Sequence, residues 1–299
     1  MITQTIDNVT FQLGEPYDFS FLSQYGQVFC AFDANDSGNI SFGAEDGRNK
    51  YFIKIAGAKT KNYAGDPAQA VISLENAMPL YRELKHPSLI ELLDHYPIEK
   101  AYVAVFRWAT GDCLFDYWNF EKYTENRLLS PISKYLRLPV TKRLESLEVI
   151  FKFLLHTESK GYVAVDFYDG SILYDFLSDK TTICDIDFFR KRPTKNDMGI
   201  DFWGTKRLKS PEEYIWDAPI DERTNVHTLG ALIFHFFGKY KDTEIAKMYK
   251  TNCFYPCAHE AFELGRELYG IALKATSNER SARYNSIHQF YRDWKSKLF

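Results

Sequence analysis

Residues 162–188 read YVAVDFYDGSILYDFLSDKTTICDIDF. They contain two short apolar segments, 171–174 and 181–184, joined by a polar turn, and this pattern predicts a β-hairpin. Asp166 precedes the first segment and Asp185 follows the second. The hairpin would therefore bring to one end two acids that are nineteen residues apart in sequence (185 − 166).

Two acids at one end of a hairpin indicate phosphoryl transfer. One carboxylate could hold Mg²⁺ on the phosphates of a nucleotide, while the other takes up or orients the acceptor hydroxyl. Aspartate is also common at strand ends, where it stabilises turns, so both residues could be purely structural. This stretch by itself favours neither interpretation.

The composition is that of an ordinary globular protein, with 299 residues of which 45% are hydrophobic and 26% charged. A net charge of -3 and a pI near 6.2 provide no basic surface for nucleic acid or an anionic membrane. The N-terminus lacks the pattern of a signal peptide, and the longest apolar run, residues 229–238, is too short to span a bilayer. The five cysteines suit a reducing compartment. We therefore expect a cytoplasmic protein that binds neither nucleic acid nor membranes.

The first part of the chain has the pattern of a small β-sheet. Residues 1–26 give little signal, but residues 27–57 contain three strand-like segments separated by turns, which predict a meander. Residues 67–85 show apolar positions at helical spacing after an initial proline, and Pro79 is expected to kink or break that helix. Two more strands within residues 87–109 complete a five-stranded antiparallel sheet with one helix.

The rest of the chain is mainly helical apart from the hairpin. Apolar spacing predicts helices within residues 114–159, 222–238, 257–276 and 284–297. The chain shows no repeat, low-complexity tract or long linker, so its two parts are expected to pack as one domain. The fold class predicted from these elements is α+β.

A β-rich lobe with one helix, a helical lobe and a two-acid hairpin together resemble the protein kinase fold. Lys54, in Tyr-Phe-Ile-Lys, resembles the third-strand lysine that contacts the α and β phosphates of ATP in that family. Residues 33–40 lie where the family has GxGxxGxV, and they keep Gly38 and have Ile40 in place of the valine. The resemblance implies that both would contact the nucleotide.

The acidic hairpin matches the same family residue by residue. Asp166 stands in the place of the catalytic aspartate, and Ser171 in that of the asparagine five residues later. Asp185 stands in the place of the metal-binding aspartate, within Asp-Ile-Asp rather than Asp-Phe-Gly. The resemblance implies that Asp185 and Ser171 bind Mg²⁺ and that Asp166 accepts the proton of the acceptor hydroxyl.

Three later motifs follow in the family's order. Residues 203–212, WGTKRLKSPE, resemble GTxxYxAPE, and residues 221–230 resemble the D-x-W-S-x-G start of a helix. Arg280 resembles the late arginine that pairs with the glutamate of APE, here Glu212, so a buried ion pair is expected between them. The chain is similar over residues 27–297 to bacterial serine/threonine protein kinases.

The resemblance implies a two-lobed domain, divided into an N-terminal extension (1–26), an N-lobe (27–108) and a C-lobe (109–299). Phe52 lies where an alanine covers the adenine ring in most protein kinases, so its ring would either stack on adenine or fill the pocket. Glu75 is the candidate partner of Lys54, although counting back from the His-Pro motif lands on Ala77 instead.

Other positions bear on activity and regulation. The resemblance implies that Thr205 hydrogen-bonds Asp166. Tyr168 replaces a lysine near the γ-phosphate, so one cation is missing unless Lys206 or Arg207 replaces it. Val165 replaces the arginine that receives an activation-loop phosphate in regulated kinases, so no activation by that route is expected.

The expected function is an ATP- and Mg²⁺-dependent serine/threonine protein kinase that transfers the γ-phosphate to a hydroxyl of a protein substrate. A pseudokinase that serves as a nucleotide-gated binding module is the alternative favoured by Tyr168, Ser171 and the degenerate phosphate loop. A small-molecule phosphotransferase of the aminoglycoside type is a third, because Phe52 and the segment Asp169-Gly-Ser-Ile resemble that group. The sequence does not predict an oligomeric state.

Overall fold

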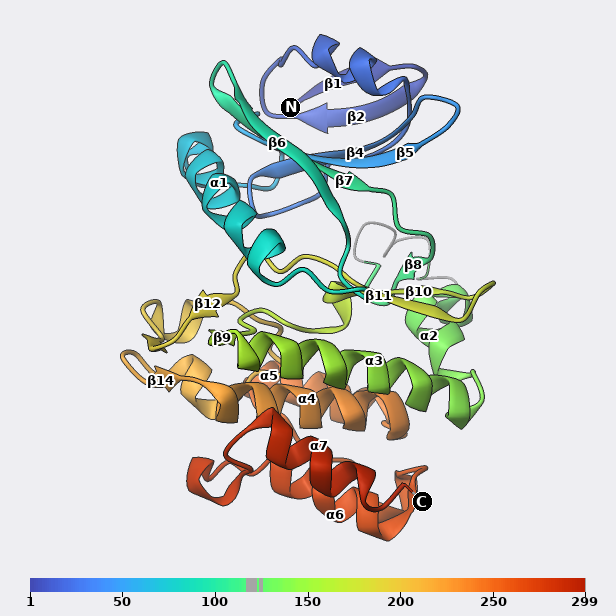
Figure 1. Cartoon of the computed structure of the whole chain (residues 1–299), viewed down its shortest axis with the longest axis vertical. Coiled ribbons are helices and arrows are strands. Elements are labelled where there is room, and N and C mark those ends of the chain that lie inside the picture. Colours follow the sequence, from blue (N-terminus) through green and yellow to red (C-terminus); the bar gives the residue numbers. More distant parts are fainter. Residues whose placement is uncertain (117–122, 124–125, 299) are drawn as a thin grey trace. The chain divides into compact units, whose positions relative to one another are not determined.

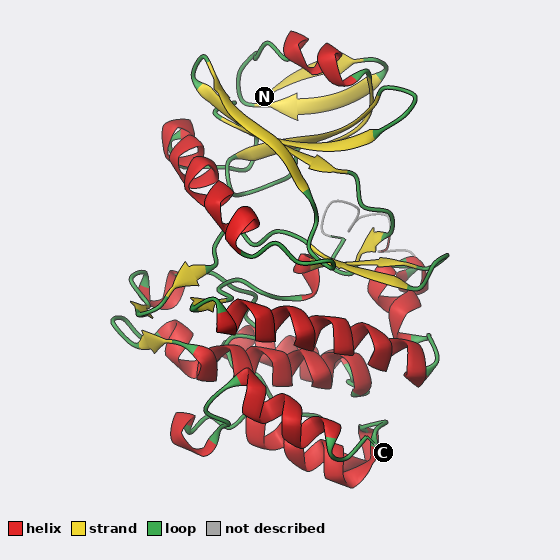
Figure 2. Ribbon diagram, viewed as in Figure 1, coloured by secondary structure: helices red, strands yellow, loops and turns green. Residues whose placement is uncertain are grey.

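The computed structural model describes residues 1–116, 123 and 126–298 (Figure 1). Residues 1–110 form one compact unit, and residues 111–116 with the described residues from 123 onward form a second. The secondary structure of each unit is distinguished in Figure 2. The first unit is rich in strands, and the second contains most of the helices.

A five-stranded antiparallel sheet forms the centre of the first unit, as predicted, with strand order β3-β4-β5-β7-β6. Its strands are β3 (Gln27–Phe32), β4 (Asn39–Glu45), β5 (Lys50–Ala56), β6 (Leu92–Ile98) and β7 (Ala101–Arg107). The helix α1 (Pro67–Glu83) packs against β5, β6 and β7. It begins where the Asp66 side chain accepts a hydrogen bond from the backbone N–H of Ala68 at 3.0 Å, with Pro67 in the first turn.

Of the kink or break expected at Pro79, the break does not occur, because α1 continues through Pro79 to Glu83. Proline removes one backbone hydrogen bond, the one to residue 75, and crowds that carbonyl. Both Pro79 and Glu75 are exposed, so water can reach the carbonyl that the proline leaves without its helical partner. The buried positions of α1, such as Leu74 and Met78, lie on its other face.

The first 26 residues, which gave no signal in the sequence, fold into a hairpin and a short helix. These elements are β1 (Ile2–Ile6), β2 (Val9–Leu13) and the 3-10 helix η1 (Ser20–Tyr25). Their apolar side chains pack with one face of the sheet in a core that includes Phe11, Leu13, Phe19 and Leu22. The N-terminal segment is therefore part of the first unit and covers one face of its sheet.

The predicted acidic hairpin is present in the second unit. β10 (Ile172–Asp175) pairs with β11 (Lys180–Ile183) in a register that sets Ile172 opposite Ile183, and β8 (Asp112–Cys113) adds a third strand. Two smaller pairs join distant segments: β9 (Tyr162–Val163) with β12 (Arg190–Lys191), and β13 (Thr194–Lys195) with β14 (Pro219–Ile220).

Helices make up the rest of the second unit. They are α2 (Pro131–Leu136), α3 (Val140–Ser159), α4 (Glu222–Phe237), α5 (Asp242–Thr251), α6 (Gly265–Ala275) and α7 (Ile287–Lys295). The helix α4 contacts α3, α6 and α7 and is buried on nearly all sides, which explains its almost continuous apolar sequence. Figure 1 shows α3 and α4 lying alongside each other.

The helical predictions hold for α3, α4 and α7, whereas the helix expected over 257–276 begins only at Gly265 and α5 was not predicted. Among the described residues of the second unit, short 3-10 helices join these elements: η3 (Arg127–Leu129), η4 (Asp169–Ser171), which directly precedes β10, η5 (Gly199–Asp201), η6 (Pro211–Tyr214), η7 (His259–Ala261) and η8 (Arg280–Ala282). No helix within residues 1–116 or 126–298 combines the length and the apolar character needed to cross a bilayer.

Candidate functional site

Lys54 lies on β5 and is buried, with 7% of its surface exposed. In the antiparallel ladder it pairs with Ser41 of β4 and Ala104 of β7, and Ala104 also pairs with His95 of β6. Directly opposed residues share a face of a sheet. Lys54 is therefore on the face that α1 covers, because Phe106, two residues from Ala104, packs against Tyr81 of α1 at 4.8 Å between ring centroids.

Phe52 lies on the same face, two residues before Lys54, in a group of aromatic rings. Its ring centroid is 5.8 Å from that of Phe32, 6.3 Å from that of Phe106 and 6.4 Å from that of Trp108. Phe52, Phe32 and Trp108 are only partly buried. These rings form a partly exposed aromatic surface on which a planar group could stack.

Ile40 does not share a face with Lys54. It pairs with Ile55 and is fully buried in the core beneath the N-terminal hairpin. Side chains alternate between the faces of a strand, so the residue that faces the Lys54 side is its neighbour, Ser41. A contact of Ile40 with a nucleotide bound on the Lys54 face has no support in this placement.

Glu75 is exposed on α1, whereas Leu74 and Ala77 occupy the buried positions. Burial lowers the pKa of His95, and the negative charge of Glu75 partly opposes this effect. Burial raises the pKa of Tyr102, and the charge of Glu75 raises it further. The structure thus places Glu75 on the flank of α1 that faces β6 and β7.

The loop expected to lie over the phosphates is held by contacts within the first unit. Asp33 accepts a hydrogen bond from the backbone N–H of Gln12 at 2.7 Å and pairs with Lys61 at 3.2 Å. Gly38 has φ +81°, and a Cβ there would lie 2.8 Å from Ala70 and from the ring of Tyr63. Any other residue at position 38 would be strained and crowded.

The second unit carries the two acids. Asp166 and Asp185 have φ values of 60° and 54°, in the left-handed region that few non-glycine residues adopt. Backbone strain of this kind costs of the order of 1–3 kcal/mol and is concentrated at functional sites. Asp166 is partly buried and Asp185 is exposed.

The backbone before Asp166 is fixed by Asn225, a residue that the sequence analysis did not select. The side chain of Asn225, on α4, accepts a hydrogen bond from the N–H of Ala164 at 2.8 Å and donates one to the carbonyl of Ala164 at 2.9 Å. The segment 221–230 was recognised as a motif, but the resemblance was centred on Asp221. Asp221 instead caps α4 by accepting from the N–H of Arg223.

Ser171 is fully buried and has a structural role in the hairpin. Its hydroxyl donates to the backbone carbonyl of Asp166 at 3.4 Å, its N–H donates to Tyr168, and its carbonyl accepts from Cys184 at 2.9 Å. A metal ligand needs a lone pair directed at an accessible ion. The burial of Ser171 is therefore unfavourable for the metal-binding role expected of it.

Tyr168 folds back over Gly170, where an added Cβ would lie 2.4 Å from its ring. Its ring also meets that of Phe115 edge-on at 5.8 Å. Burial raises the pKa of the Tyr168 hydroxyl, and the charges of Asp166 and Asp185 raise it further. The position thus supplies a neutral hydroxyl within the field of both acids.

Asp169 is buried in an ionic cluster with Arg207 and His235. Arg207 donates to both carboxylate oxygens of Asp169, at 2.5 and 2.6 Å, and Nε2 of His235 lies 3.2 Å from one of them. Burial alone would raise the pKa of Asp169, but the charge of Arg207 and the hydrogen bond with His235 lower it below its usual range. Because Arg207 is committed to this cluster, it does not replace the missing cation at position 168.

The lowered pKa of Asp169 predicts a pH dependence of stability. A carboxylate whose pKa is lower in the folded than in the unfolded state, where it is about 3.9, stabilises the fold above that value and loses this effect as the pH falls. The difference in urea midpoint between the wild type and Asp169→Asn should therefore be largest near neutral pH and shrink below about pH 4. A difference that stays constant down to the acid transition would contradict this assignment.

A small pocket beside Asp166 also includes Thr205, Lys209 and Glu213. Thr205 and Asp166 both line this pocket, and the hydrogen bond that the resemblance implies between them stays a prediction. Lys209 and Glu213 are almost fully buried, and the sequence analysis selected neither. No local pattern marks them, because Asp166 is distant from both in sequence.

The segment that follows the hairpin is held by apolar packing. Val165, in the position of a phosphate-receiving arginine, is buried in a cluster with Val163, Phe202 and Ile220. Phe188 and Trp203, at the two ends of the segment, stack with ring centroids 4.2 Å apart. The packing of this cluster requires no phosphate.

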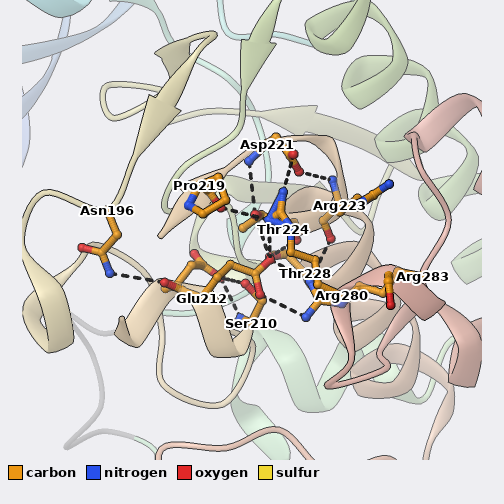
Figure 3. Close-up of polar contacts among 12 residues, drawn as sticks. Asn196, Ser210, Glu212, Pro219, Asp221, Arg223, Thr224, Thr228, Arg280 and Arg283 are labelled. Carbon is orange, nitrogen blue, oxygen red and sulfur yellow. Dashed lines mark hydrogen bonds and ion pairs between the residues drawn. The ribbon is translucent and has the colours of Figure 1, made fainter. Parts of the chain in front are cut away.

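The ion pair of Glu212 differs from the prediction. Arg283 binds Glu212 more closely than Arg280 does, through two contacts of 2.7 and 3.0 Å (Figure 3), and the Arg283 side chain is fully buried. Thr224 also donates to Glu212 at 3.0 Å. Arg280 is 3.7 Å from Glu212 and pairs more closely with Asp221. The expected ion pair between Glu212 and Arg280 is present at 3.7 Å, but the closer and more deeply buried partner is Arg283, which the sequence analysis did not select.

The five-stranded antiparallel sheet and the several helices are compatible with a protein kinase-like fold, and comparisons with known proteins support the same superfamily. Over 201 residues the chain is 24% identical to serine/threonine-protein kinase TIO of Arabidopsis thaliana, a match that covers 67% of this chain and 14% of that protein. Over 198 residues it is 23% identical to serine/threonine-protein kinase 36 of Pongo abelii, covering 66% of this chain and 14% of that one. No family model matches the chain.

This weak homology supports a protein kinase-like protein in general terms. The chain spans about a seventh of the length of the curated relatives that it matches. The similarity to bacterial kinases and to aminoglycoside phosphotransferases, expected from the sequence, remains a prediction, because these two relatives come from a plant and a primate.

Proposed function

We propose that the chain is an ATP-dependent serine/threonine protein kinase that transfers the γ-phosphate to a hydroxyl of a protein substrate. The observation that carries this proposal is the pair Asp166 and Asp185, which flank the β10–β11 hairpin and are both held in the left-handed conformation. Homology to two serine/threonine protein kinases supports the same reaction class.

Asp166 would act as the general base. As the acceptor oxygen forms its bond to the γ-phosphorus, its proton passes to the Asp166 carboxylate, and the bond from phosphorus to the bridging oxygen breaks with its electron pair leaving on ADP. Asn225 fixes the backbone that presents this carboxylate. In the first unit, Lys54 would contact phosphate oxygens and the aromatic surface at Phe52 would stack on the base.

The described residues could hold one Mg²⁺ ion through few protein ligands. They contain no group of three or more His, Cys, Asp or Glu side chains that could hold a metal ion by itself. Mg²⁺ on a nucleotide takes most of its ligands from phosphates and water and needs only one or two carboxylates, so Asp185 would suffice. When bound, the ion would neutralise charge on the phosphates. Ser171 is unsuited to assist, for the reasons given above.

A nucleotide-gated binding module with little transfer activity is the second candidate. Two observations favour it: the Ser171 hydroxyl is committed to the backbone of Asp166, and the neutral Tyr168 replaces a cation near both acids. The small-molecule phosphotransferase has less support, because Asp169, which belongs to the motif shared with that group, is buried against Arg207 and His235.

One assay separates these functions. The protein is incubated with Mg²⁺ and ATP labelled on the γ-phosphate, together with a serine- and threonine-containing protein and, separately, hydroxylated small molecules. Label on protein that is lost in Asp185→Asn supports the kinase. Thermal stabilisation by ATP without any label supports the binding module, and label on small molecules alone supports the third function. The absence of both label and thermal stabilisation would refute all three functions.

Activation by phosphorylation is not expected. Thr194 already pairs with Ile220 in the ladder between β13 and β14, and Val165 offers no positive charge. The variant Thr194→Glu should therefore transfer phosphate at the wild-type rate in the assay above, with Thr194→Ala as the uncharged control. A clear gain of activity in Thr194→Glu alone would show that a charge-receiving site exists.

A further inference from the structure

The pocket beside Asp166 contains a buried lysine with no evident reason to be buried. Lys209 is 5% exposed, and its ammonium group donates to the carbonyl of Phe202 and lies 4.4 Å from the centre of the Tyr214 ring. Both partners are uncharged. Burying an ammonium group without a contacting carboxylate is unfavourable by several kcal/mol, of the order found for buried ions.

Carboxylates lie near Lys209 without touching it. Within the part of the chain that the structure describes, Lys209 forms no ion pair within 4.0 Å. Burial lowers its pKa, whereas the charges of Glu213, Asp166 and Asp201 act to raise it and that of Lys206 to lower it. The positive charge of Lys209 therefore interacts with several acids, Glu213, Asp166 and Asp201, without forming an ion pair with one of them.

Glu213 is the second ionisable group of the pocket. One of its oxygens accepts from the N–H and hydroxyl of Ser210, at 2.6 and 2.8 Å, and so caps η6. Burial raises the pKa of Glu213 to about 7, against those hydrogen bonds. The pocket thus places beside Asp166 a second carboxyl group that is mostly protonated, and therefore neutral, below neutral pH.

The neighbouring sequence gives Lys209 its place. Gly204 has φ +126°, and a Cβ there would lie 2.9 Å from Cγ of Lys209, so only glycine leaves room for the lysine stem. The two other cations of this segment do not reach the pocket in the same way. Arg207 is bound to Asp169, and Lys206 is exposed.

We propose that Lys209 is a positioning residue for the transfer reaction, whose buried positive charge in the same pocket keeps Asp166 ionised and ready to accept the proton. This inference rests on the proposed kinase function. It assigns to position 209 an electrostatic role that Tyr168 cannot provide.

The test is the pH dependence of kcat/KM for labelled-phosphate transfer. An opposite charge nearby shifts a carboxylate pKa by about 1–3 units, so Lys209→Met should move the acid limb upward by up to that amount, while KM for ATP stays unchanged. Lys209→Arg, which keeps the charge, should restore most of the wild-type profile. Lys206→Met, which removes an exposed charge of the same segment, should leave the profile in place.

A second variant covers the case in which Lys209→Met does not fold. Lys209→Gln keeps a hydrogen-bond donor for the carbonyl of Phe202 but removes the charge, so it should move the acid limb upward as Lys209→Met does. Unchanged acid limbs in the folded variants, with transfer still strongly lowered by Asp166→Asn, would overturn this inference alone. Absence of transfer in the wild type would overturn the proposed kinase function and this inference together.

Discussion

Replacing Asp166 by asparagine is expected to lower the rate of phosphate transfer by about 10²–10⁴-fold, the range typical of losing a general base. Asparagine has nearly the same shape but cannot accept the proton of the acceptor hydroxyl. Because the backbone at this position is held by Asn225 through two hydrogen bonds to Ala164, the variant should keep the wild-type fold. Single-turnover transfer and thermal unfolding would be measured on the same preparation.

The control for this variant lies at the other end of the same hairpin. Asp175 closes β10 and accepts hydrogen bonds from the N–H of Leu177 and the hydroxyl of Ser178 in the turn. Asp175→Asn changes the same functional group without reaching the pocket at Asp166, so transfer should be unaffected. If Asp166→Asn were as active as Asp175→Asn, Asp166 would not be the base.

Removing Arg283 is expected to destabilise the second unit by about 3–5 kcal/mol, the cost of leaving a buried charge without its partner. Glu212 is nearly buried, and Arg283 is its main ionic partner through two contacts. Although burial would raise the pKa of Glu212, the hydrogen bonds and charge of Arg283 lower it. The variant Arg283→Met keeps a long apolar side chain, and urea unfolding at neutral pH would measure the loss.

Arg280→Met is the matched control, because it removes the arginine that the sequence motif favoured. Arg280 is less buried, lies 3.7 Å from Glu212 and pairs with Asp221 near the surface. Such partly exposed pairs contribute about 0–1 kcal/mol. A larger effect for Arg280→Met than for Arg283→Met would restore the original assignment and contradict the geometry in Figure 3.

The local patterns of the sequence were sufficient for most of the fold. Alternating strand segments predicted the sheet from β3 to β7, and two apolar segments around a polar turn predicted the hairpin that carries Asp166 and Asp185. The candidate site could be predicted in part, because Asp166 and Thr205 were both selected and line one pocket. Glycine, proline and aspartate at the turns encode these features within a few residues.

Other features depended on contacts between segments that are distant in sequence. Spacing alone could not choose between Arg280 and Arg283 as the partner of Glu212, since both carry the same charge near the same motif. The strand register, set by cross-strand hydrogen bonds, placed Lys54 and Ile40 on opposite faces.

The sequence by itself determined the strands of the five-stranded sheet, the acidic hairpin and the helices α3, α4 and α7, because their apolar spacing and turn residues are short-range patterns, and the resemblance to protein kinases added the ion pair of Glu212. The tertiary structure alone decided that Ser171 is buried, that Asn225 holds the backbone before Asp166, and that Lys209 lies beside it. Burial and charge environment arise from all the segments that pack around a side chain, and no local pattern specifies them.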